Sequence, residues 1–196
     1  TFARCLCGLD KRALGELELN GHSYRAKQRC HISYMVMQDV NHQLFTEDVL
    51  DELLLSMDGE DEKENTEWAN QILSSLDLAA KIKLHPMSLS GGEKQRVAIG
   101  SAIASNKEIL VFDEPTSGLD YFHMVEVSDN LNRLKDMGKS LFLITHDPEL
   151  IYKCCTYLLF IQENKVLWHR PMDDEAIKLL RAFFSHEKGA NIINAS

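Results

Sequence analysis

Short apolar runs alternate along this chain with stripes of apolar residues at helical spacing. The runs typical of buried strands cover residues 32–37, 109–113 and 140–145. Apolar residues three or four positions apart predict helices over 47–57 and 69–76, and further helices over 124–134 and 176–184. Strands that alternate with helices predict an α/β fold around a largely parallel sheet, with its binding site at the carboxyl ends of the strands.

Two further segments have the pattern of antiparallel hairpins. Residues 15–24 alternate around Asn20-Gly21, a dipeptide that favours a two-residue turn, and residues 157–161 and 165–168 flank Glu163-Asn164. A short apolar segment, Phe2 to Leu9, has the composition of a helix that ends at Gly8. We therefore expect edge hairpins beside the parallel sheet.

The stretch Leu89–Arg96 (LSGGEKQR) predicts a helix that begins on a serine and two glycines. Unpaired N–H groups at such a start, together with the Ser90 hydroxyl, form a receptor for anions. Ser90 and Glu93 also fit a capping box, which would make the stretch only a well-capped helix. Gly91 and Gly92 favour phosphate contact, because paired glycines cost helix stability unless a group must approach the backbone closely.

The second chemical candidate is the strand Ile109–Asp113, which is followed directly by Glu114. At a strand end, where the chain turns, neighbouring carboxylates can reach one crevice and hold Mg²⁺ or activate water. Two solvated acids are the structural alternative, but this does not explain the apolar strand before them. Gln38 and His146 also follow predicted strands. Taken alone, such a glutamine is more often a surface loop residue, and such a histidine more often has a structural role than a catalytic one.

Together, LSGGEKQR, Ile109–Asp120 (ILVFDEPTSGLD), Gln38 before them and Thr145-His146-Asp147 after them resemble the nucleotide-binding cassette of ABC ATPases. The resemblance implies a P-loop NTPase-like core with an α-helical subdomain over about residues 46–104. It implies ATP and Mg²⁺ as ligands, with Asp113 and Gln38 at the metal and Glu114, His146 and Gln38 in the catalytic roles. The implied nucleotide contacts across a head-to-tail dimer of cassettes are Ser90, Gly91, Gly92, Glu93 and Asp120.

The stretch Gln38–Phe45 (QDVNHQLF) is similar to a narrower group, the ATPases of energy-coupling factor importers for vitamins and transition-metal ions. That resemblance implies a transmembrane partner subunit and a place on the cytoplasmic face of the membrane. Thr1 aligns just after the family's phosphate-binding loop G-x-x-x-x-G-K-[ST] (Walker A), so that loop lies outside this sequence. We expect residues 1–196 to form a single truncated cassette domain that binds ATP poorly by itself.

The composition of the chain narrows the functions and partners that it could have. The net charge is -9, and between Glu47 and Glu67 ten acidic residues face only Lys63, which disfavours nucleic acid as a partner. The chain has neither an apolar run of about 20 residues nor a signal-peptide pattern at its start, and its five cysteines predict reduced, mostly buried thiols. Beside an importer ATPase, two hypotheses remain. One is a module that lends Ser90 and Gly92 of its signature motif, Leu89–Arg96, to another protein's ATP without hydrolysing it. The other is a soluble ABC ATPase of DNA repair or translation.

Overall fold

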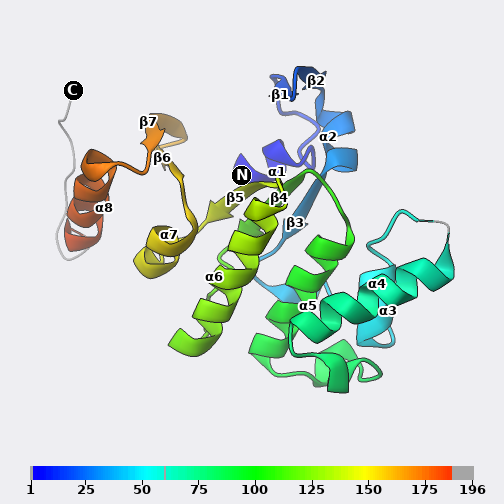
Figure 1. The fold of residues 1–196 in the computed structure, drawn as a ribbon. Helices are drawn as coiled ribbons and strands as arrows, with labels where there is room; N and C mark the ends of the chain where they lie inside the picture. Colours follow the sequence, from blue (N-terminus) through cyan, green and yellow to red (C-terminus); the bar gives the residue numbers. More distant parts are fainter. Residues whose placement is uncertain (1, 60, 187–196) are drawn as a thin grey trace. The chain divides into compact units, whose positions relative to one another are not determined.

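The computed structural model describes residues 2–59 and 61–186, which divide into two compact units at the bond between Thr145 and His146. The first unit runs from α1 (Phe2–Leu6) to the end of β5 (Ser140–Ile144). The second contains α7 (Pro148–Cys154), β6 (Tyr157–Gln162), β7 (Lys165–Pro171) and α8 (Asp174–His186). Figure 1 labels these elements.

A three-stranded parallel sheet lies at the centre of the first unit, in the order β3 (Ser33–Val36), β4 (Ile109–Asp113), β5. Along β4, side chains alternate between the two faces, and both sets are buried. Ile109 and Val111 pack with α1, whereas Leu110 and Phe112 are buried on the other face. A parallel sheet covered on both faces confirms the predicted α/β class.

The predicted N-terminal hairpin is also confirmed. β1 (Leu17–Leu19) pairs antiparallel with β2 (His22–Tyr24), and both turn residues, Asn20 and Gly21, have positive φ. A helix that the apolar pattern did not predict, α2 (Ala26–Ile32), follows, so β3 begins at Ser33 instead of Ile32. Only Arg29 of α2 is buried, and its guanidinium donates to the carbonyls of Cys5, Gly15 and Tyr24.

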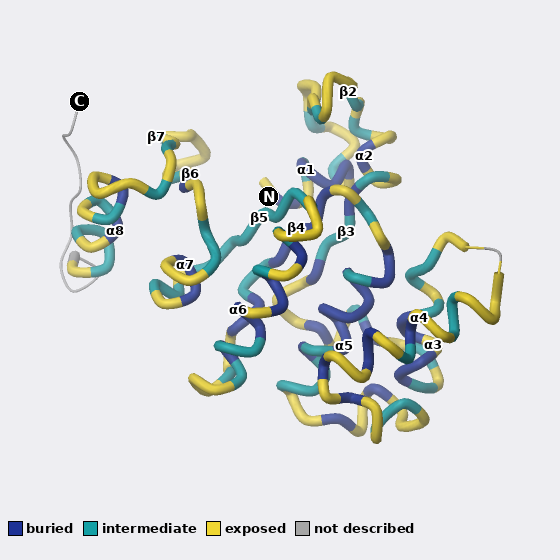
Figure 2. The backbone as a smooth tube through the Cα atoms, viewed as in Figure 1, coloured by how far each residue is buried: buried dark blue, intermediate teal, exposed yellow. Residues whose placement is uncertain are grey.

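The predicted helical subdomain consists of α3 (Val49–Leu54), α4 (Glu62–Ser75) and α5 (Gly91–Ala104). The two predicted helices differ in extent: α3 is shorter than the stripe over 47–57, and α4 begins at Glu62 because the Asp61 carboxylate caps it. α5 packs against both and is buried over most of its length (Figure 2). In residues 2–59 and 61–186, no helix combines the length and apolar character needed to cross a membrane.

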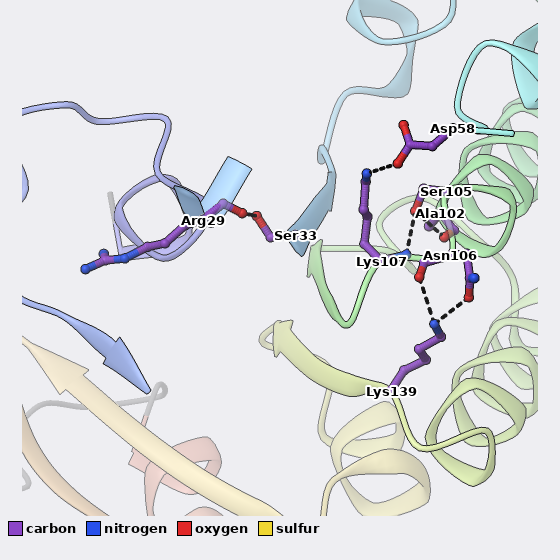
Figure 3. A network of polar contacts seen from close by, with 8 residues as sticks. All are labelled: Arg29, Ser33, Asp58, Ala102, Ser105, Asn106, Lys107 and Lys139. Atoms are coloured by element: carbon purple, nitrogen blue, oxygen red, sulfur yellow. Dashed lines mark hydrogen bonds and ion pairs between the residues drawn. The ribbon is translucent and has the colours of Figure 1, made fainter. Parts of the chain in front are cut away.

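Lysines fix the loops at the amino ends of β4 and β5 (Figure 3). Lys107 forms an ion pair with Asp58 of the α3–α4 connection. Lys139, which precedes β5, donates to the Asn106 carbonyl at 2.9 Å and to its side-chain oxygen at 2.7 Å. These contacts hold the helical segment and both strands at the end of the sheet opposite the candidate site.

The second unit is a β6–β7 hairpin packed on α8. Its turn residues, Glu163 and Asn164, both have positive φ, as the sequence pattern predicted. Phe160 stacks on Trp168 and contacts Phe183 edge to face, so the aromatic side chains join hairpin and helix.

The cysteines correct one prediction. All five are free thiols, but only Cys7 is buried and Cys30 is exposed. Burial raises the pKa of the Cys7 thiol, so this side chain stays protonated at neutral pH.

Candidate functional site

The carboxyl ends of the three parallel strands meet at one edge of the sheet, as the register shows. Val36 pairs with Phe112, and Asp113 pairs with Ile144. Asp113, Glu114 and Thr145 therefore lie together at this edge, and Gln38 follows the end of the neighbouring strand by two residues. The predicted placement of Asp113, Glu114 and Gln38 on one edge agrees with this topology.

The backbone turns sharply at Glu114. Its φ is 48°, a left-handed conformation that costs a non-glycine residue about 1–2 kcal/mol. The turn is held by the Glu114 N–H, which donates to the Ile144 carbonyl at 2.8 Å, and by the Thr145 hydroxyl, which donates to the Glu114 carboxylate at 3.2 Å. Strain at a residue of this kind is typical of functional sites, where the fold imposes a side-chain direction.

Asp113 and Glu114 form a pair of neighbouring carboxylates. Burial, followed by the adjacent charge of Glu114, raises the pKa of Asp113 above its ordinary value. A divalent cation would offset both effects, and hard oxygen ligands from one or two carboxylates beside substrate phosphates are what Mg²⁺ prefers. The two neighbouring carboxylates at this edge, Asp113 and Glu114, are therefore of the chemistry that Mg²⁺ prefers beside substrate phosphates.

The loop after Gln38 is closely tied to its surroundings. Asp39 accepts from the backbone and side chain of Asn41, and the Asn41 side-chain oxygen accepts from Lys94 of α5 at 2.9 Å. Gln43 returns to the end of β3, and its side-chain oxygen accepts from the Met37 N–H at 3.1 Å. Gln38 itself is exposed.

The loop is held at its other end by Glu52, which is 4% exposed. One carboxylate oxygen of Glu52 accepts from the N–H groups of Phe45 and Thr46 and from the Thr46 hydroxyl at 2.8 Å. The acidic run between Glu47 and Glu67 is thus not uniformly a solvated face. This buried carboxylate connects α3 to the segment that follows Gln43.

The predicted capping box at the start of α5 is present. The Glu93 N–H donates to the Ser90 hydroxyl oxygen, and the Ser90 N–H donates to the Glu93 carboxylate at 2.8 Å. Lys81 adds an ion pair with Glu93 at 3.4 Å. Because the cap uses the Ser90 oxygen as an acceptor, the hydroxyl proton can still be donated to an anion.

The two signature glycines have different surroundings. A Cβ added at Gly91 would meet no atom within 4 Å, whereas one at Gly92 would lie 3.6 Å from side-chain atoms of both Leu119 and His123. Asp120 caps α6 (Tyr121–Asp136) by accepting from the His123 N–H at 3.0 Å, and its carboxylate lies 2.8 Å from His123 Nδ1. The fold thus brings the signature and Asp120 to neighbouring helix starts, with open space beside the Gly91 backbone.

The capping box gives a pH-dependent prediction. The Ser90 N–H lowers the pKa of Glu93 below its ordinary value, so the ionised carboxylate stabilises the fold above about pH 5, and this contribution is lost as the pH falls through the lowered pKa. Glu93→Gln should lower the free energy of unfolding by about 0.5 kcal/mol at pH 7, because water screens this site. Urea denaturation should find that this difference from the wild type disappears once the pH is below the lowered pKa of Glu93; a difference independent of pH would contradict the assignment.

The structure does not place every predicted site residue relative to the others. His146 is the first residue of the second unit, so its place beside Glu114 stays a prediction. Gln43, Glu52, Thr145 and His123 were not assigned roles from the sequence. Only the capping pattern at Asp120 offered a signal for His123. Gln43 and Glu52 act through contacts across a loop, and Thr145 through a contact with a neighbouring strand end, and none of these contacts has a sequence pattern.

The motifs and geometry agree with a family comparison: a sequence profile of the ABC transporter family matches residues 1–117. The chain belongs to the ABC transporter family. This ABC chain is 42% identical over 168 residues to a protein of Treponema denticola named as an ABC transporter ATP-binding protein. That match covers 85% of this chain and 33% of the relative, so the ABC chain spans a third of that relative's length. It is also 34% identical to the methionine import ATP-binding protein MetN of Bacillus subtilis, covering 85% of this chain and 51% of MetN.

Solved structures support the ABC cassette fold. CbiO1 from Clostridium perfringens, described as part of the ABC transporter complex CbiONQ, aligns with a TM-score of 0.78 at 20% identity. The alignment covers 96% of this ABC chain and 78% of CbiO1. MJ1267, solved in its ADP conformation, aligns with a TM-score of 0.80 at 20% identity and covers 96% and 82% of the two chains. The predicted fold, a cassette core with parallel sheet and antiparallel hairpins, is therefore confirmed.

Proposed function

We propose that this chain belongs to the ATP-binding subunit of an ABC importer, in which ATP hydrolysis in a cassette dimer drives solute uptake. The observation that carries the proposal is the meeting of Asp113 and Glu114 with the end of the Gln38 strand at one sheet edge. The proposed solute is a vitamin or a transition-metal ion. CbiO1 and MetN, which are described as components of transport systems, support an importer.

Each site residue has a proposed role in hydrolysis. Asp113 and Gln38 hold Mg²⁺, which when bound offsets the charge of the phosphate oxygens. Glu114 accepts a proton from water as the water oxygen forms a bond to the γ-phosphorus and the bond from that phosphorus to the ADP oxygen breaks. His146 contacts the γ-phosphate and orients the water.

The signature serves a second cassette. Ser90, Gly91, Gly92 and Glu93 contact the γ-phosphate held by the partner in a head-to-tail dimer, and Asp120 lies in the loop that crosses the interface. The open space beside the Gly91 backbone supports such an approach. We also propose that residues 1–196 act as one cassette domain with a helical subdomain over about 46–104, peripheral to the cytoplasmic face of the membrane and bound to a transmembrane subunit.

Calorimetry tests the proposal directly. This chain is expected to bind ATP weakly or not at all, whereas a version extended upstream by a G-x-x-x-x-G-K-[ST] loop should bind ATP and hydrolyse it. If the extended protein binds ATP but does not hydrolyse it, the result would instead support the second candidate, a non-hydrolytic module that lends Ser90 and Gly92 to another cassette. Salt-sensitive binding to nucleic acid, without any transmembrane partner, would support a soluble ATPase of repair or translation.

A further inference from the structure

The side chain of Gln43 completes the end of β3 in the way a neighbouring strand would. Its oxygen accepts from the Met37 N–H at 3.1 Å, and its Nε2 donates to the Met35 carbonyl at 3.2 Å. Met35 and Met37 are two residues apart, and their N–H and C=O groups are those that an extended strand presents to one side. One half-buried amide thus replaces a missing ladder partner immediately before Gln38.

A second contact fixes the Gln43 amide itself. Nε2 also lies 3.2 Å from the Tyr34 hydroxyl oxygen, and that hydroxyl is 3.3 Å from the hydroxyl of Ser56, which follows α3. The amide oxygen of Gln43 therefore accepts from one backbone N–H, and its nitrogen donates to a backbone carbonyl and to the tyrosine hydroxyl. With these partners its orientation is determined, because a flipped amide would place its NH₂ group against the Met37 N–H.

Among the described residues, the other hydrogen bonds of the loop between Gln38 and Gln43 do not reach β3. Its own bonds are local: Asp39 accepts from Asn41, and the Gln43 N–H donates to the Val40 carbonyl at 3.0 Å. The Lys94–Asn41 bond connects the loop to α5 rather than to the strand. Gln43 is accordingly the side chain of this loop whose hydrogen bonds reach the backbone at Met35 and Met37.

We propose that Gln43 is a positioning residue for the hydrolytic site, acting through Gln38. The inference rests on the proposed function, in which Gln38 reaches Mg²⁺ and the attacking water. In extended backbone, successive side chains point to opposite sides, so a small rotation at Met37 redirects Gln38. Displacements of about 1 Å at a catalytic group can lower rates by about 100-fold.

The test is a double-mutant cycle in a turnover-competent protein that contains this chain. Gln43→Met keeps the length of the side chain and removes all three contacts. We expect kcat to fall by about 10- to 100-fold, the apparent Mg²⁺ activation constant to rise, and KM for ATP to stay within about twofold. In a Gln38→Ala background, Gln43→Met should have no further effect on kcat.

Gln71→Met is the matched control, because Gln71 is exposed on α4 and the same substitution there should leave turnover unchanged. Hydrogen exchange provides a measurement that does not need activity: Gln43→Met should speed exchange at the Met37 amide without changing the amides of β4. A loss of the same size in the Gln38→Ala background, or unchanged exchange at Met37, would overturn the inference. A wild type without turnover would instead overturn the proposed function on which it rests.

Discussion

Replacing Glu114 with glutamine is expected to lower ATP turnover by about 10²- to 10⁴-fold in a protein that contains this chain and a phosphate-binding loop. The reason is chemical: glutamine preserves the size and the Thr145 contact but cannot accept the proton of the attacking water. The backbone turn at Glu114 does not depend on the side-chain charge, so the fold should be retained. Steady-state phosphate release measures the effect.

Glu67→Gln provides the control for this prediction, because Glu67 is an exposed carboxylate on α4, away from the sheet edge. It should turn over ATP at the wild-type rate. Turnover by Glu114→Gln within a factor of about 10 of the wild type would remove Glu114 from the role of base and assign the water's proton to another acceptor.

Alanine at position 8 is expected to lower the free energy of unfolding of the first unit by about 4 kcal/mol. Gly8 has a φ of 71°, which costs alanine about 1–2 kcal/mol. A Cβ at Gly8 would also lie 1.9 Å from the Ala26 carbonyl oxygen, so α1 and α2 cannot both keep their positions. Such overpacking against backbone typically costs a further 1–3 kcal/mol, and urea denaturation measures the sum.

Gly138→Ala separates these two costs. Gly138 has a φ of 80°, but a Cβ there would meet no atom within 4 Å. It should therefore lose only the conformational part, about 1–2 kcal/mol. Equal losses for Gly8→Ala and Gly138→Ala would show that the α1–α2 contact contributes nothing.

The elements that were predicted correctly are those that a pattern of neighbouring residues marks in the sequence. Asn20-Gly21 and Glu163-Asn164 predicted both hairpins, because a tight turn requires residues that tolerate positive φ. The helix α2 was missed because it has no apolar stripe: its buried residue is Arg29, which is satisfied by distant carbonyls. The beginning of α4 was missed because Asp61 is one of many acids, and only its contacts identify it as a cap.

The candidate site likewise contains features that a local sequence pattern predicts and features that it does not. The capping box of Ser90 and Glu93 and the strand-end position of Asp113 follow from spacing alone. The left-handed turn at Glu114 and the amide of Gln43 do not, because their partners belong to other strands or to the far end of a loop. Local patterns thus predict the groups proposed for chemistry, but not the backbone turn at Glu114 or the contacts of Gln43.

The central claim, that each hydrolytic site combines the carboxylates of one cassette with the signature of another, is tested most directly by mixing two inactive variants. Ser90→Arg should block the signature, and Glu114→Gln should remove the base, so each variant alone should be inactive as a dimer. A mixed dimer restores one complete site, formed by Glu114 of the first variant and Ser90 of the second. We predict that mixing restores ATP turnover to a substantial fraction of the wild-type rate. A mixture as inactive as its components, beside an active wild type, would contradict the account.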